Sequence, residues 1–416
     1  MANRIVILGG GTGGTLAANR LQRTLGEHAQ ITVIDRDDHH VYQPGLLLLP
    51  FGEGDPHRLV RSRRAQLRPG ISFQTGEVEQ VDTQAGSVKL SDGGEVPYDV
   101  LVIASGARLL PEETEGLTGP GWQQRSFTFY TLEGAIGLRD ALRDFQGGRL
   151  VVNVVDMPIK CPVAPLEFSF LADWYFRRRG IRERVEISFV TPLDGAFTKA
   201  TCNRELSGLL EQKGISVTTE FNTGRVDGEA GRLVSWDERE IDFDLLVSVP
   251  LHGGFEYVSR SPGLGDDLGF VCVDRATLQA QVAPNVFALG DATDVPTSKA
   301  GSVAHFQGET LVENVRRFLA GEPLVPSFDG HTNCFIETGF HKALLIDFSY
   351  DVEPLPGRYP IPGVGPLPLL RQSYLNHAGK IGFQWLYWNV LLPGLDLPGV
   401  GSEFQIAGKD TTPISA

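Results

Sequence analysis

The four cysteines are the residues of this 416-residue chain with the clearest capacity for redox chemistry. They stand at positions 161, 202, 272 and 334, too far apart for a C-x-x-C dithiol or a zinc-binding pair. Cys161 is distinctive because it follows Lys160 and comes just before a predicted helix at 165–179. A neighbouring cation and a helix N-terminus both favour a thiolate, so we predict that Cys161 is a reactive thiol. Cys272 lies in a strand-like run and is expected to be structural.

A glycine-rich turn near the N-terminus predicts a dinucleotide site. Gly9, Gly11 and Gly14 satisfy G-x-G-x-x-G directly after an apolar strand at 4–8, and a helical pattern follows. A second strand then ends on Asp35. Glycines let the backbone approach a pyrophosphate at the helix N-terminus, and an acid at this distance accepts hydrogen bonds from ribose hydroxyls. Because every element falls in register, we assign these four residues to cofactor binding.

Two later strands suggest which dinucleotide is bound. One ends in the small residues Ala104 and Gly106, and another, near residue 285, runs into Gly290 and Asp291 before a long helix. This set resembles the flavoprotein superfamily of disulfide-reductase type. The resemblance implies FAD, with Asp291 on the ribityl chain. It also implies that the helix N-terminus and Lys299 lie near the pyrimidine edge of the flavin, where positive charge stabilises the reduced form.

The segment where such flavoproteins bind NAD(P)H carries a different pattern. A strand at 148–155 and the helix at 165–179 are in the expected places, but no glycine stands between Asp156 and Glu167. Backbone cannot approach a pyrophosphate closely through the prolines and branched residues found there. We therefore predict a second Rossmann-like domain without an NAD site. Cys161 occupies the position from which nicotinamide would otherwise reach the flavin.

Two motifs identify a family resemblance. K-C-P-V-A-P-L-E, from Lys160 to Glu167, and H-V-Y-Q-P-G-L, from His40 to Leu46, resemble sulfide:quinone oxidoreductases and the related flavoprotein subunit of sulfide dehydrogenases. Those enzymes carry a second redox cysteine late in the chain, and Cys334 matches it. The resemblance implies that Cys161 and Cys334 meet in the tertiary structure. Glu167 either moves protons beside Cys161 or stabilises the first turn of its helix.

The implied activity is FAD-dependent oxidation of sulfide, or a related sulfane donor, with electrons passed to a quinone. Sulfide would attack a Cys161–Cys334 disulfide or sulfur-bridged pair, giving a persulfide and a thiolate. Many family members also have a cysteine between the first two domains, but residues 125–130 contain none, which favours non-covalent FAD. Three alternatives stay open: a sulfide dehydrogenase that reduces a cytochrome, a non-catalytic flavin partner, and a redox sensor in sulfur transfer.

The segment 369–395 is rich in aromatic residues. Read as a helix, it presents a broad apolar face, which is typical either of an in-plane membrane contact or of a docking helix. Within the family resemblance we expect a quinone and membrane side formed by Phe383, Trp385, Tyr387 and Trp388. The Pro-rich stretch 354–368 before it is expected to be a stiff connector.

Composition limits the partners. A formal net charge of −14 excludes nucleic acid as the main partner, and no metal site is expected. The predicted class is α/β, with two Rossmann-like dinucleotide-binding-type domains and a C-terminal membrane or quinone region. We expect a discontinuous FAD domain at 1–112 and 280–330, a second domain at 113–279 and the C-terminal region at 331–416. No secretory signal pattern precedes the first strand, so we expect a cytoplasmic protein, peripheral on the inner face of the membrane, and leave a homo-oligomer open.

Overall fold

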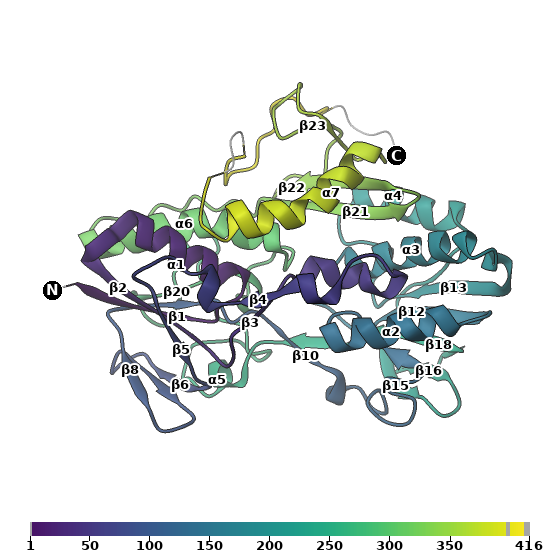
Figure 1. The fold of residues 1–416 in the computed structure, drawn as a ribbon, viewed down its shortest axis with the longest axis horizontal. Helices are drawn as coiled ribbons and strands as arrows, with labels where there is room; N and C mark the ends of the chain where they lie inside the picture. The colour runs from purple at the N-terminus through teal and green to yellow at the C-terminus, as the bar shows by residue number, and fades with distance from the viewer. Residues whose placement is uncertain (1, 397–399, 412–416) are drawn as a thin grey trace.

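The computed structural model describes residues 2–396 and 400–411. Its first large sheet has the strand order β20-β9-β1-β2-β5, and every pairing in it is parallel. The strands are β1 (Asn3–Leu8), β2 (Ala29–Asp35), β5 (Ser72–Thr75), β9 (Val100–Ile103) and β20 (Val286–Ala288). Helices α1 (Thr12–Leu25) and α6 (Gly301–Ala320) pack against each other over this sheet (Figure 1).

A second parallel sheet has the order β11-β18-β12-β13-β14. Its strands are β11 (Ser126–Phe127), β12 (Gly148–Val154), β13 (Val185–Val190), β14 (Ser216–Thr218) and β18 (Leu245–Val249). Three helices accompany it: α2 (Leu132–Asp144), α3 (Ala164–Arg178) and α4 (Ala200–Gln212). Parallel strands joined through helices are the signature of Rossmann-like folding, so the predicted α/β class with two such domains is confirmed.

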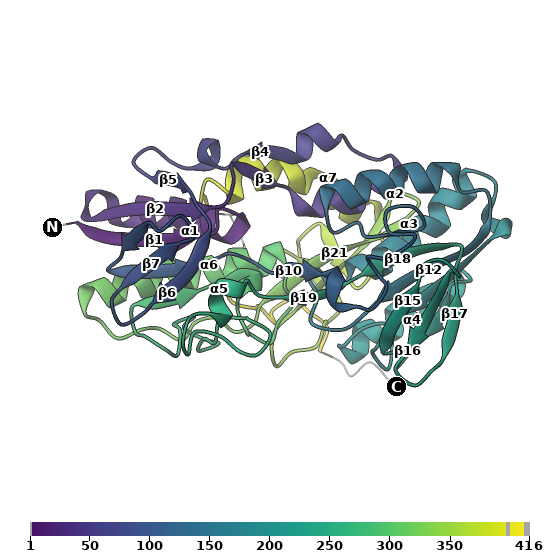
Figure 2. The same cartoon turned by 90° about the horizontal axis from the view of Figure 1, so that it is seen from below.

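Each large sheet forms one half of the molecule together with a smaller antiparallel sheet. An antiparallel meander follows β5 and consists of β6 (Val78–Asp82), β7 (Ser87–Leu90) and β8 (Glu95–Pro97). A similar unit follows in the second half, with β15 (Thr223–Asp227), β16 (Arg232–Ser235) and β17 (Glu240–Asp242). The chain crosses between the halves through β10 (Arg108–Leu110) and β19 (Leu251–Gly253), which pair with each other; Figure 2 shows them midway along the molecule.

The C-terminal part begins with a hairpin of β21 (Thr332–Gly339) and β22 (Lys342–Phe348). A second hairpin, β23 (Gly357–Tyr359) and β24 (Leu367–Leu369), follows where we expected a stiff connector, so that expectation is wrong. Helix α7 (Tyr374–Leu386) then packs on β22 and continues into a π-helical turn, η9 (Tyr387–Leu391). Among the residues that the structure describes, none of the helices has the length and hydropathy needed to cross a bilayer.

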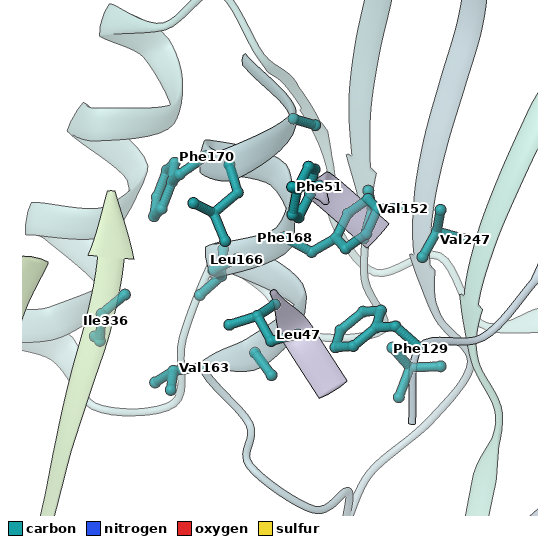
Figure 3. Packing of buried hydrophobic residues seen from close by; sticks show 14 of the residues in the cluster. Leu47, Phe51, Phe129, Val152, Val163, Leu166, Phe168, Phe170, Val247 and Ile336 are labelled. Atoms are coloured by element: carbon teal, nitrogen blue, oxygen red, sulfur yellow. The ribbon is translucent and has the colours of Figure 1, made fainter. Parts of the chain in front are cut away.

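The core of the second half joins the C-terminal hairpin to α3. Phe168 stacks on Phe129 with ring centroids 5.1 Å apart, and Phe51 from the N-terminal half packs against Phe168 at 4.9 Å. Ile336 of β21 belongs to the same buried cluster (Figure 3). Packing of β21 against α3 therefore brings the Cys334 strand next to the Cys161 turn, which sequence separation alone does not reveal.

The core of the first half includes residues that we had assigned to the second domain. Tyr257, Leu264, Val271 and Leu278 all pack in the cluster around the first sheet. This packing favours a return to the first domain near β19 rather than at residue 280.

Candidate functional site

A cavity of about 590 Å³ lies between the two large sheets. Its walls come from the glycine turn after β1, the ends of β2 and β9, the turn before α3, and the C-terminal strand and helix. They include most of the predicted site residues: Gly9, Gly11, Asp35, Ala104, Gly106, Cys161, Glu167, Gly290, Asp291, Lys299, Cys334, Phe383 and Tyr387. A pocket of this size, formed at the carboxyl ends of parallel strands, is typical of a cofactor site.

The glycine turn shows why these positions need glycine. Gly9 has a φ of 96°, and a Cβ there would lie 2.5 Å from the carbonyl oxygen of Ala104. A Cβ on Gly14 would lie 1.8 Å from the oxygen of Gly9, so Gly14 lets helix α1 pack on the turn. A Cβ on Gly11 would meet nothing within 4 Å. Gly11 thus leaves open the path along which a pyrophosphate would reach the N-terminus of α1.

Asp35 lies at the end of β2, as predicted, and its carboxylate already has two partners. Oδ2 accepts the backbone N–H of Gly10 at 2.7 Å and pairs with the Arg63 guanidinium at 2.9 Å. Both Asp35 and Arg63 line the cavity. Arg63 was not predicted, because it comes from a separate segment that only the tertiary fold brings to β2.

The turn after β20 presents an unpaired carboxyl group to the cavity. The Gly290 N–H donates to Gln307 Oε1 at 2.6 Å, which fixes the turn. The Asp291 carboxyl group accepts no hydrogen bond from any residue within the described ranges, and burial raises its pKa. An unpartnered carboxyl beside a glycine-lined channel fits a polyhydroxyl chain attached to a pyrophosphate, so the residues present fit FAD.

Lys299 lies in the cavity wall, but its ammonium group contacts protein atoms. The ammonium donates to the backbone oxygens of Asp291 at 3.1 Å and Thr293 at 2.7 Å, and it lies 3.7 Å from the centroid of the Phe270 ring. Burial lowers its pKa to about 8. Lys160 and Lys380 also lie in the wall, and burial lowers the pKa of Lys160 although Asp291 attracts its charge.

The two predicted redox cysteines meet at the same cavity. Cys161 has a φ of 46°, its N–H donates to the Lys299 oxygen at 2.7 Å, and its carbonyl accepts the Ala164 N–H at 2.9 Å. Cys334 comes from β21, and both side chains are free thiols. The turn before α3 therefore aims one sulfur at the cavity while the hairpin supplies the other.

Burial, rather than the neighbouring lysine, dominates the ionisation of these thiols. Burial raises the pKa of Cys161 well above its ordinary value, with further contributions from the charge on Glu167 and from Cys334. Burial and Glu167 likewise raise the pKa of Cys334 to about 12. Our expectation that Lys160 favours a Cys161 thiolate is therefore wrong. The cation that lowers the pKa of both thiols is Lys380, on α7.

Glu167 belongs to a buried ionic group that the sequence did not reveal. Its carboxylate pairs with the Lys380 ammonium and accepts the Glu337 N–H at 2.6 Å. Burial raises the pKa of Glu167, whereas Lys380 opposes that rise. The Glu337 carboxylate in turn lies 3.0 Å from Nδ1 of His377. His377 and Lys380 are three residues apart on α7, a spacing that places both on one helix face.

The predicted aromatic group divides between the cavity and the surface. Phe383 and Tyr387 line the cavity, and the Tyr387 hydroxyl contacts Thr12 Oγ1 at 2.7 Å and His40 Nε2 at 2.6 Å. Trp388 is buried, and only Trp385 is exposed, with 66% of its surface accessible. The membrane part of the assignment is therefore wrong for Tyr387 and Trp388, and their place on the quinone side stays a prediction. The π-helical turn holds them against the N-terminal half instead.

Comparison with known proteins places this geometry in a wider group. Residues 3–153 match the family model described as pyridine nucleotide-disulphide oxidoreductase. The mitochondrial sulfide:quinone oxidoreductases of Mus musculus and Dictyostelium discoideum are 27% and 26% identical to the chain, each aligned over 94% of it and 86% of the relative. The crystal structure of the sulfide:quinone oxidoreductase from Aquifex aeolicus superposes with a TM-score of 0.77 at 20% identity, covering 93% of this chain and 92% of that one.

Proposed function

Because the chain is an oxidoreductase of the sulfide:quinone oxidoreductase family, we propose that it uses FAD to oxidise sulfide, or a related sulfane donor, and reduces quinone. The observation that carries this proposal is the placement of two cysteines from distant segments, Cys161 and Cys334, in the wall of one glycine-lined cavity. A glycine-free turn around Cys161 argues against NADH as the donor.

FAD is the cofactor whose parts match the cavity from end to end. Gly9 and Gly11 would receive the pyrophosphate, Asp35 the ribose and Asp291 the ribityl hydroxyls. When bound, FAD supplies two-electron acceptor chemistry between the cysteines and the quinone. The small residues Ala104 and Gly106 leave room for close approach in the same wall.

The sulfur step belongs to the two cysteines in their disulfide form. Hydrosulfide attacks one sulfur, the S–S bond between Cys161 and Cys334 breaks, and a new S–S bond forms a persulfide on the attacked residue while the other leaves as a thiolate. The sulfane sulfur then passes to a second sulfide or another thiol, which leaves both cysteines reduced. When the Cys161–Cys334 disulfide forms again, two electrons leave the two cysteines. The net reaction converts sulfide and quinone into sulfane sulfur and quinol.

Glu167 and Lys380 control the charge and protons around that step. Lys380 stabilises the thiolate that leaves, since it is a cation that lowers the pKa of both cysteines. Glu167 holds Lys380 in place through their ion pair. The contact between Glu337 and His377 extends this group toward solvent, because the His377 side chain is 24% exposed. Protons needed by quinone would pass along this chain.

The quinone would enter beside α7, where the cavity wall contains Phe383 and Tyr387. The outer face of α7 carries exposed apolar side chains, Tyr374, Leu375, Ile381 and Trp385. An in-plane helix of this kind buries such a face at the membrane surface. We therefore propose a peripheral protein that takes its apolar substrate from the bilayer at α7.

An anaerobic spectroscopic titration tests the reaction. Sulfide is expected to bleach the flavin of the purified FAD-loaded protein, and quinone to restore the oxidised spectrum. Cys161→Ser and Cys334→Ser should both lose bleaching by sulfide, whereas Cys272→Ser, which lies outside the cavity wall, should keep it. Bleaching by NADH in place of sulfide would overturn the proposal, and so would an unchanged response to sulfide in either active-site variant.

A further inference from the structure

The lysines and arginines of this acidic chain are mostly paired, but a few near α7 are not. Ion pairs with carboxylates neutralise most of them, such as those formed by Arg143, Arg232 and Arg317. Twelve of them form no ion pair with any carboxylate in the described part of the chain, and four of these twelve lie near α7: Arg61, Lys342, Arg358 and Arg371. Arg61, Arg358 and Arg371 are exposed, and Lys342 is partly so.

Three of these four cations lie at the ends of α7. The Arg61 guanidinium is 4.4 Å from the Trp388 ring centroid, in the turn that continues the helix. The Lys342 ammonium is 5.3 Å from the Tyr374 ring centroid at its first residue. The carbonyl of Arg371, just before the helix, accepts a hydrogen bond from the Asn376 side chain at 3.1 Å.

The fourth cation lies on the hairpin beside α7. Arg358 of β23 stands opposite Pro368 of β24, and β24 contacts α7. The loop between these strands carries two exposed apolar residues, Ile361 and Val364, the latter 80% accessible. Unpaired cations thus lie next to an apolar surface formed by the outer face of α7 and the tip of the hairpin.

We propose that this surface, which we call the α7 face, docks on an anionic lipid bilayer, its cations binding lipid phosphates while its apolar side chains enter the interface. The proposal rests on the membrane contact proposed above and adds the headgroup that the contact selects. A protein with a net charge of −14 is repelled by an anionic surface unless cations face it. Unpaired cations around an in-plane helix supply that attraction.

Charge also argues against a second copy of the chain as the occupant of the α7 face. In a two-fold symmetric pair the same face would meet itself, so that Arg61, Lys342, Arg358 and Arg371 would face a surface that carries the same four cations. Like charges facing one another across an interface are unfavourable. Lipid phosphates satisfy the same cations, since guanidinium groups bind phosphate with paired hydrogen bonds.

Vesicle co-sedimentation of the FAD-loaded protein tests the inference. We expect strong binding to vesicles of phosphatidylcholine mixed with phosphatidylglycerol, weak binding to phosphatidylcholine alone, and release from the mixed vesicles as salt is raised. The triple variant Lys342→Gln, Arg358→Gln, Arg371→Gln should bind the mixed vesicles about a hundredfold more weakly, at about fivefold for each charge. Arg61 is left in place because its side chain packs on Trp388.

A charge control and an apolar control complete the experiment. Arg184→Gln removes an exposed arginine that forms no ion pair with any described carboxylate and lies just before β13. This variant should bind the mixed vesicles as wild type does. Trp385→Ser should weaken binding to both kinds of vesicle. Wild-type protein that binds neutral and mixed vesicles equally, or a triple variant that binds normally, would overturn the anionic selection and leave the membrane contact standing. Failure to bind either vesicle would overturn both. Reduction of a water-soluble quinone by the triple variant shows that it is folded.

Discussion

A carboxylate and an ammonium group lie near the two cysteines, and their opposing effects help to set the pKa of each thiol. Burial holds both thiols protonated, the negative charge of Glu167 adds to that effect, and Lys380 opposes it. Because Glu167 and Lys380 pair with each other, removing the carboxylate alone leaves the cation beside the sulfurs. Glu167, which the sequence suggested as a proton carrier beside Cys161, therefore also makes the thiolate form harder to reach.

We expect Glu167→Gln to make the reduced cysteines more reactive. A glutamine keeps an oxygen for the Glu337 N–H but removes the negative charge, so the pKa of both thiols falls and the thiolate forms at lower pH. The pH profile of iodoacetamide labelling should shift toward acid, with labelling roughly tenfold faster near neutral pH. Glu313→Gln on the outer side of α6 is the control and should label like wild type. Slower labelling in Glu167→Gln would contradict this assignment of charges.

Gly11 offers a test of the cofactor site that spares the fold. Its backbone is extended, and a side chain would enter open space, so Gly11→Val should fold but obstruct the pyrophosphate path. We expect the purified variant to retain less than about a tenth of the wild-type flavin, since the backbone can no longer approach the phosphates. Gly208→Val on α4, where a Cβ also meets nothing within 4 Å, is the matched control. Normal flavin content in Gly11→Val would place the pyrophosphate elsewhere.

At the scale of elements, helix α7 carries different side chains on two faces, and each face has its own role. Lys380 and His377 point toward Glu167 and Glu337, whereas Trp385 and its apolar neighbours face outward. The spacing of these residues follows the helix period, so one short helix supplies both the charges near the sulfurs and the α7 face.

We expect His377→Gln to slow reoxidation of the flavin by quinone about tenfold and to leave bleaching by sulfide unchanged. The imidazole is partly exposed and contacts Glu337, so it is placed to exchange protons between solvent and the buried pair. Stopped-flow measurement of the two half-reactions separates the effects, and imidazole in the buffer should restore part of the lost rate. His28→Gln, in the exposed turn between α1 and β2, is the control. Equal slowing of both half-reactions would indicate a structural role instead.

The sequence predicted the elements that carry local signals. The glycine turn, the strand that ends on Asp35 and the turn at Gly290 and Asp291 are all present, because each depends on a short pattern of period and turn chemistry. Lys380 and Arg63 were missed, since each reaches its partner from a distant segment. The burial of Tyr387 and Trp388 was also missed, because helix periodicity does not reveal which face meets another domain.

At the scale of the whole molecule, the cavity lies between two separate cores. The first core surrounds β1 and the second surrounds β12. The halves are joined by short connecting strands, by residues 42–59 of the N-terminal part, which pack in the second core, and by the C-terminal part. A cofactor held by Gly11 and Asp291 on one side, with Cys161 on the other, would therefore contact both. Any ligand that binds only the assembled state stabilises that assembly.

We expect removal of FAD to lower the stability of the protein and to uncouple its two halves. With free FAD at about 100 times its dissociation constant, binding adds about 2.7 kcal/mol to the free energy of unfolding. All five tryptophans lie between positions 122 and 388, outside the first 112 residues, so their fluorescence reports on the second half and the C-terminal part. In urea, fluorescence and circular dichroism should coincide for the FAD-loaded protein and separate for the apoprotein. Gly11→Val should behave as the apoprotein even when FAD is added, because its cavity is blocked at the phosphate path. Coincident curves with equal midpoints in the presence and absence of FAD would show that the cofactor does not link the two cores.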